Sequence, residues 1–123
     1  MIIVVRIYEV HSVDSQAFIH SFDDGGPWHR ISNRVAVHVH TDLLRRADLP
    51  TTFLVQEFWE SERHFALAER NAEVRNFLQW IRTLAVGHQR LGAFSFRNAW
   101  ESESNFETSF WAPAEFARQQ VRQ

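Results

Sequence analysis

Three residues near the end of one apolar segment carry the side chains best suited to chemistry. Glu57 and Trp59 alternate with other side chains between residues 52 and 59, and His64 follows five residues later. Residues two apart on a strand share one face, so Glu57 and Trp59 are predicted to point the same way. A carboxyl group among apolar side chains has a raised pKa and can act as an acid or a base. We therefore predict Trp59, Glu57 and His64 as catalytic candidates, with an ion pair between Glu57 and an arginine as the structural alternative.

A second pair of candidates is His38 and His40, which lie two apart in a strand pattern spanning residues 35–44. On a regular strand both imidazoles would share a face, where they could contact a ligand, ligate a metal with Asp42, or supply one general base. The intervening valines are predicted to be the buried set: Val35, Val37 and Val39. The histidines would then face a dimer partner or water. We favour this interface interpretation and predict no metal site.

The order of predicted elements is β-α-β-β-α-β. Alternating apolar residues predict strands at residues 2–9, 35–44, 52–59 and 90–97. A first helix follows Asp14 and reaches Phe22, and a short second piece begins at Pro27. One long helix is predicted from a Ser61 cap to Gly87. This split βαβ order indicates an α+β, ferredoxin-like fold with a four-stranded antiparallel sheet.

Composition excludes several classes of function. The 123 residues include thirteen basic side chains, all arginine, so lysine Schiff-base chemistry is excluded. Cysteine is absent, which excludes disulfides, a thiolate nucleophile and cysteine-ligated zinc. A net charge of −2 argues against a nucleic-acid partner. No apolar run is long enough for a membrane helix and no signal-peptide pattern is seen, so we expect no membrane partner and a cytoplasmic location.

The length suits one folded domain with an extension. Apolar residues make up 45% of the chain and aromatic residues 14%. We predict a domain over residues 1–97. Residues 98–123 begin with a polar stretch and then become rich in Phe and Trp. This extension is predicted to pack on its own subunit or on a partner, because exposed aromatic segments tend to associate.

Several short motifs resemble the antibiotic-biosynthesis-monooxygenase-like family of dimeric α/β barrels. The motif that suggests it is Phe58-Trp59-Glu60-Ser61-Glu62-Arg63-His64-Phe65, a strand that ends in Trp before a capped helix. One subgroup is also similar at Gly26-Pro27-Trp28, Thr41-Asp42-Leu43-Leu44-Arg45 and Arg90-Leu91-Gly92-Ala93-Phe94. The resemblance covers roughly residues 1–97. It implies a homodimer in which two four-stranded sheets face each other with the helices outside.

The activities found in this family fit the sequence unevenly. Its quinone-forming oxygenases share Trp59, but the positions of their Asn, Tyr and Arg are occupied here by Val55, Phe65 and Gln79. Losing one preorganised donor to an anionic intermediate typically costs on the order of a hundredfold in rate or more. Its haem-degrading members need an axial His, and the matching position is Leu78. We therefore predict no cofactor.

These observations predict a cofactor-independent, monooxygenase-like protein that acts on or binds a small aromatic molecule. The alternative is a non-catalytic small-molecule-binding or structural homodimer, so whether the chain is an enzyme stays open. The expected site lies between the sheet and the helices. Its predicted ligand contacts are Trp28, Val55, Phe65, His38 and His40.

Overall fold

The computed structural model describes residues 1–35 and 38–95. The strands are β1 (Ile2–Val10), β2 (His38–Arg45), β3 (Thr52–Trp59) and β4 (Ala85–Ser95). The helices are α1 (Ser15–Ser21), α2 (Pro27–Val35), α3 (Glu62–Arg70) and α4 (Ala72–Thr83), and a 3-10 turn, η1 (Ser12–Asp14), precedes α1.

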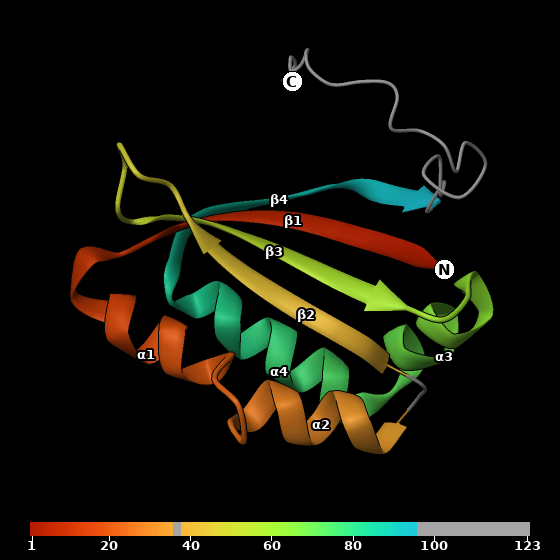
Figure 1. Cartoon of the computed structure of the whole chain (residues 1–123). Coiled ribbons are helices and arrows are strands. Elements are labelled where there is room, and N and C mark those ends of the chain that lie inside the picture. The colour runs from red at the N-terminus through yellow and green to blue at the C-terminus, as the bar shows by residue number, and fades with distance from the viewer. Residues whose placement is uncertain (36–37, 96–123) are drawn as a thin grey trace, which may run out of the picture.

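The four strands form one antiparallel sheet in the order β2-β3-β1-β4. All of the helices lie on one side of this sheet, so the described part of the chain has two layers (Figure 1). The α+β, ferredoxin-like prediction is confirmed.

The buried face of β3 is the one that alternation predicted. Phe53, Val55, Glu57 and Trp59 are all buried, whereas the residues between them are partly exposed. On β1, which pairs with β3, Val4, Arg6, Tyr8 and Val10 are likewise buried. The helices cover both sets with apolar side chains, among them Phe18, Trp28, Phe65, Phe77 and Ile81. Two charged residues, Arg6 and Glu57, therefore lie within an otherwise apolar layer.

The single long helix predicted after Ser61 is wrong, because Asn71 divides it. Asn71 adopts an extended conformation (φ −72°, ψ 132°), and its side chain accepts hydrogen bonds from the backbone N–H groups of Glu73 and Val74. An Asn that caps in this way competes with helix continuation. The helix then ends at Thr83, so Gly87 lies inside β4 and does not serve as a cap.

The second strand also differs from its prediction. Val35 is the last residue of α2, and β2 begins only at His38. Val39 is 49% exposed, so it does not belong to a buried valine set. Val37 lies outside the described residues. The predicted alternation began at Val35, which belongs to α2. In a helix, residues two apart do not share a face, so the pattern did not mark a strand there.

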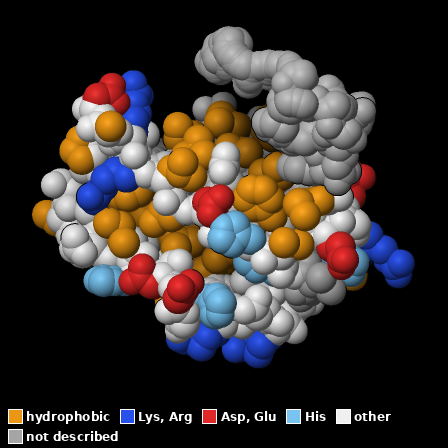
Figure 2. Space-filling view, viewed as in Figure 1, with side chains coloured by type: hydrophobic (Ala, Val, Ile, Leu, Met, Phe, Trp, Pro, Cys, Tyr) orange, Lys and Arg blue, Asp and Glu red, His pale blue; other side chains and the backbone are white. Residues whose placement is uncertain are grey.

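The sheet face away from the helices is apolar along much of its length. Phe58 and Phe94 both pair with Ile3, and Leu54 pairs with Ile7, so these side chains share that face. Figure 2 shows apolar side chains gathered over the strands with a few acidic and histidine side chains among them. The predicted aromatic extension lies outside the described residues. Among the helices that are described, none is both long and apolar enough to cross a membrane.

Candidate active site

The predicted centre around Trp59 is a filled aromatic core. Trp59 is fully buried, and its ring lies 6.0 Å from that of Phe65 and 6.5 Å from that of Trp28, centroid to centroid. Val55 is buried in the same layer. Trp28 donates a hydrogen bond from Nε1 to the Thr41 hydroxyl at 3.0 Å, which fixes the ring against β2. The structure thus brings the predicted residues together but packs them against one another.

Glu57 is held by a buried ion pair. Its Oε2 accepts from Arg6 on β1, and its Oε1 accepts from the Trp59 indole N–H at 3.1 Å. Burial raises the pKa of the Glu57 carboxyl, while the Arg6 guanidinium and the Trp59 N–H act against that rise. The ion-pair alternative considered for Glu57 is therefore what the structure shows. The catalytic role of Glu57 stays a prediction, because Glu57 does not line the cleft described below.

His64 lies at the beginning of α3, where it takes part in a cap. The Ser61 hydroxyl accepts from the His64 backbone N–H at 3.2 Å and lies 2.8 Å from its Nδ1. Helix starts favour Ser at this position for that reason. Both bonds tie His64 to the cap, and His64 does not line the cleft described below.

The prediction that His38 and His40 share a face is wrong. A register shift at Val39 pairs His38 with Trp59 and His40 with Phe58, so the two imidazoles lie on opposite faces of the sheet. The His38 ring lies 4.9 Å from the Trp59 ring, and His40 lies 5.7 Å from Phe58. Within the described residues no group of three or more potential metal ligands occurs.

His38 belongs to a small polar network at the edge of the aromatic core. Its Nε2 lies 2.6 Å from the Thr41 hydroxyl and its Nδ1 lies 3.4 Å from the Ser32 hydroxyl. Burial lowers the pKa of His38 to about 4, with smaller contributions from the neighbouring His40 and His29. His38 is therefore neutral at physiological pH. His40 sits instead on the open face, beside Asp42 at 2.5 Å.

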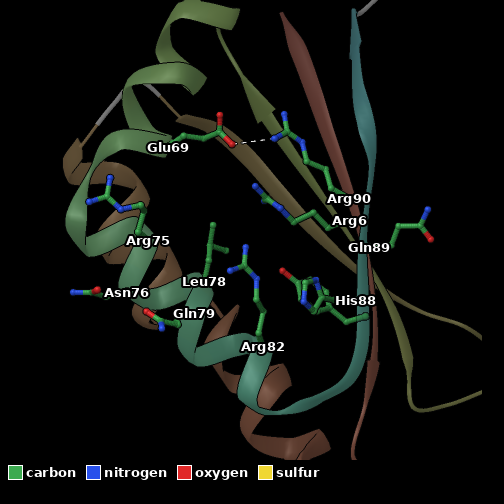
Figure 3. Close-up of a pocket in the computed structure, with 11 residues that line it drawn as sticks. Arg6, Glu69, Arg75, Asn76, Leu78, Gln79, Arg82, His88, Gln89 and Arg90 are labelled. Carbon is green, nitrogen blue, oxygen red and sulfur yellow. Dashed lines mark hydrogen bonds and ion pairs between the residues drawn. The ribbon is translucent and has the colours of Figure 1, made fainter.

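An open cleft lies beside the filled core, between α4 and strands β1 and β4 (Figure 3). Its volume is about 540 Å³. It is lined by Arg6, Tyr8, Glu69, Arg75, Asn76, Leu78, Gln79, Arg82, His88, Gln89 and Arg90. The buried residues Tyr8 and Leu78 contribute to its floor, and the more exposed side chains form its rim.

The cleft is rich in arginine. In Figure 3, Arg6 from β1 and Arg82 from α4 extend into the space, and Arg90 from β4 reaches Glu69 across its upper end. Arg90 donates to Glu69 at 3.0 Å, and its guanidinium lies 5.0 Å from the centre of the Phe65 ring. Arg90 therefore connects the cleft to the aromatic core. Burial raises the pKa of the Tyr8 hydroxyl, so this group remains a hydrogen-bond donor at neutral pH.

The sequence analysis missed these cleft residues, although each element carries a signal for them. Arg6 and Tyr8 share the buried face of β1 with Val4 and Val10, and they pair with Arg90 and His88 of β4. Arg75 and Arg82 are seven residues apart, which places them on one side of a helix. The sequence indicates which residues share a face of each strand and of the helix. It does not indicate that these faces meet at one cleft, because that depends on how α4 crosses β1 and β4.

Solved structures of distant proteins share this architecture. SnoaB, a cofactor-independent oxygenase from Streptomyces nogalater, matches with a TM-score of 0.61 at 18% identity, over 79% of this chain and 93% of SnoaB. A protein from Nitrosomonas europaea, provisionally assigned as an antibiotic biosynthesis monooxygenase, matches with a TM-score of 0.62 at 18% identity, over 78% and 98% of the two chains. The chain has the fold of the antibiotic biosynthesis monooxygenases.

The same fold also occurs without an assigned activity. A conserved protein from Methanosarcina mazei matches with a TM-score of 0.63 at 11% identity, over 78% of this chain and 92% of its own. No family model and no curated protein matches the sequence. The resemblance inferred from the motifs is thus confirmed at the level of fold, and the antibiotic-biosynthesis-monooxygenase fold alone does not specify a reaction.

Proposed function

We propose that this chain is a cofactor-independent, monooxygenase-like protein that takes a small aromatic molecule into the cleft between α4 and strands β1 and β4. The observation that carries the proposal is the cleft itself. It offers about 540 Å³ beside an aromatic core, with the Tyr8 hydroxyl and the Arg6 and Arg82 side chains at its lining. Sites for small molecules typically combine an apolar wall with a few converging polar groups.

The proposed chemistry needs an anionic intermediate to be stabilised near a proton carrier. Oxidation of a ring CH₂ to a carbonyl consumes one O₂: one oxygen atom becomes the carbonyl oxygen on that ring carbon, and the other leaves as water with the two hydrogens. The positions that supply donors in the quinone-forming oxygenases supply none here, since Val55 and Phe65 are buried apolar residues. Tyr8 and Arg82 are the donors that would replace them. Glu57 remains the candidate proton carrier, and it lies next to the cleft as the ion-pair partner of Arg6.

Binding and oxygen uptake test the two parts of this proposal separately. We expect 2-naphthol to bind the wild-type protein, and a Gln79→Trp variant to bind it at least about tenfold more weakly because the indole fills the cleft. Ala66→Trp, on an exposed position of α3 outside the lining, is the matched control. Equal binding by the wild type and Gln79→Trp would contradict the location of the site.

For catalysis, anthrone is the first substrate to test, with oxygen uptake and quinone absorbance followed together. We expect slow turnover or none with anthrone, because the donors of the quinone-forming relatives are absent. A panel of phenols that bind without any oxygen uptake would favour the second candidate function, a non-catalytic small-molecule-binding protein. The filled core around Trp59 is the observation that supports this second candidate.

We also propose a homodimer formed through the open sheet face. Phe94 is 51% exposed on this face, and Ile3, Ile7, Leu54 and Phe58 surround it or continue it along the strands. Exposed apolar surface of this extent commonly marks an interface. Sedimentation should show a dimer at micromolar concentration, and Phe58→Glu should shift it to monomer. A wild-type monomer would contradict the proposal.

A cytoplasmic location stays a prediction from the sequence.

A further inference from the structure

The charges around the cleft do not balance. Arg6 is paired with Glu57, and Arg90 is paired with Glu69. Arg75 donates to the backbone carbonyl of Arg70, an uncharged acceptor. Arg82 makes no ion pair with any residue that the structure describes. Two positive charges therefore remain at the cleft once the two carboxylates are counted.

Arg82 is well placed to act on a ligand in the cleft. It extends from the last turn of α4 toward the space that Arg6 enters from β1 (Figure 3). The same positive charge is felt by the buried Tyr8, whose pKa is lowered by Arg6 and Arg82 against the larger effect of burial. A guanidinium presents its donors in a planar fork that matches a carboxylate. Arg82 and the Tyr8 hydroxyl thus offer donors at the same end of the cleft.

The other surfaces of the cleft suit an apolar ring. Leu78 of α4 is buried at its floor, and the Tyr8 ring lies 6.2 Å from the ring of His88. At the opposite end, Arg90 lies over the Phe65 ring, which is outside the lining of the cleft. An acid group near Arg82 would leave the rest of a flat molecule over Leu78.

From these contacts we propose that the cleft selects aromatic carboxylates, with Arg82 as the main anion contact and Arg75 as a weaker one at the rim. This inference rests on the proposed function, because it names the class of molecule taken by the same site. It goes beyond it by predicting that an uncharged analogue of the same shape binds poorly.

The test compares 2-naphthoate with 2-naphthamide, which has nearly the same shape and no charge. Calorimetry at low ionic strength should give a dissociation constant about tenfold lower for 2-naphthoate, since a charged hydrogen bond typically contributes that much. The advantage should shrink at about 0.15 M salt because the rim is exposed.

Variants of the exposed arginines assign the effect to residues. Arg82→Gln should remove most of the preference for 2-naphthoate, because it weakens the binding of 2-naphthoate much more than that of 2-naphthamide. Arg82→Lys should restore part of it, since the charge returns without the planar fork. Arg75→Gln should reduce it by about twofold to threefold, as expected of a solvent-exposed charge. Arg63→Gln, an exposed position of α3 outside the lining, is the control and should change nothing.

The outcomes separate this inference from the proposed function. Equal affinity for 2-naphthoate and 2-naphthamide would overturn the anion preference while leaving an aromatic site in place. A preference that survives Arg82→Gln would overturn the role of Arg82. If neither compound nor 2-naphthol binds, the proposed function fails together with the inference.

Discussion

The two halves of the layer between sheet and helices differ in what fills them. Under β2 and β3, the rings of Trp28, Trp59 and Phe65 close the space. On the same side of the sheet, next to β1 and β4, the space is lined by long polar side chains such as Arg82, and it stays open. Aromatic rings fill volume because they can meet edge to face at close distance. Arginines keep their charged ends in water, so a region lined by them does not collapse.

The buried ion pair lies at the boundary between these halves. Glu57 belongs to the aromatic side through its bond to Trp59, and Arg6 belongs to the cleft side. Arg6 therefore links Glu57, the candidate proton carrier, to the cleft that contains the candidate anion contact Arg82. A substitution in the filled half should change mainly the free energy of unfolding. A substitution in the open half should change mainly the affinity for a ligand.

The largest effect is expected from Trp59→Ala. Truncating a fully buried aromatic side chain leaves a cavity and should lower the free energy of unfolding by about 4 kcal/mol. The variant also removes the donor to Glu57. Urea unfolding followed by circular dichroism measures the loss. Trp80→Ala, on an exposed position of α4, should cost less than about 1 kcal/mol. Similar losses in the two variants would show that the Trp59 side is not the stabilising half.

The next largest effect is expected from Arg6→Met, which leaves Glu57 buried without its cation. We expect a loss of about 3 kcal/mol at neutral pH. The pKa of Glu57, already raised by burial, should rise further once Arg6 is gone. A raised carboxyl pKa stabilises the folded state at low pH and is lost as pH increases through it. The variant should therefore recover stability on acidification toward the ordinary pKa of a glutamate.

Glu57→Gln separates the stability role of Glu57 from a catalytic one. Gln can still accept the indole N–H, and Arg6 borders the cleft, so we expect a smaller loss than in Arg6→Met, about 1–2 kcal/mol. If Glu57 is catalytic, turnover of an oxidised substrate should fall even under conditions where the variant is fully folded. Unchanged turnover in Glu57→Gln would remove Glu57 from the catalytic candidates and leave it as an ion-pair partner.

His38 should make the filled half sensitive to acid. Its pKa falls from 6.5 to about 4 on folding, so the unfolded chain binds more protons between these values. Stability should therefore decrease as pH is lowered from about 6.5 to 4, by about 1–2 kcal/mol after allowing for partial exposure. The measurement is urea unfolding of wild type and His38→Gln over this range. A decrease of the same size in both proteins would exclude His38 as its source.

The smallest effect on stability is expected from Arg82→Gln, on the open half. Arg82 is exposed and makes no ion pair within the described residues, so the free energy of unfolding should change by less than about 0.5 kcal/mol. A loss above about 1 kcal/mol would show that Arg82 supports the fold, and would end the distinction between a stabilising half and a binding half.

The sequence by itself determined the order of elements and the inner face of β3. The alternation of Phe53, Val55, Glu57 and Trp59 is a local property, because a strand's period of two depends only on backbone geometry. The Ser61 cap is local for the same reason. It also determined the family resemblance, since the motif around Trp59 is contiguous.

Only the tertiary structure decided what those faces enclose. The bulge at Val39 separates His38 from His40, and it arises from pairing with β3, which no strand pattern reveals. Whether Glu57 meets an arginine depends on Arg6, fifty-one residues away. The cleft exists because α4 crosses β1 and β4 with Arg82 where a bulky apolar residue would have closed the space. Packing between distant segments fixes cavities, and local periodicity carries no information about their volume.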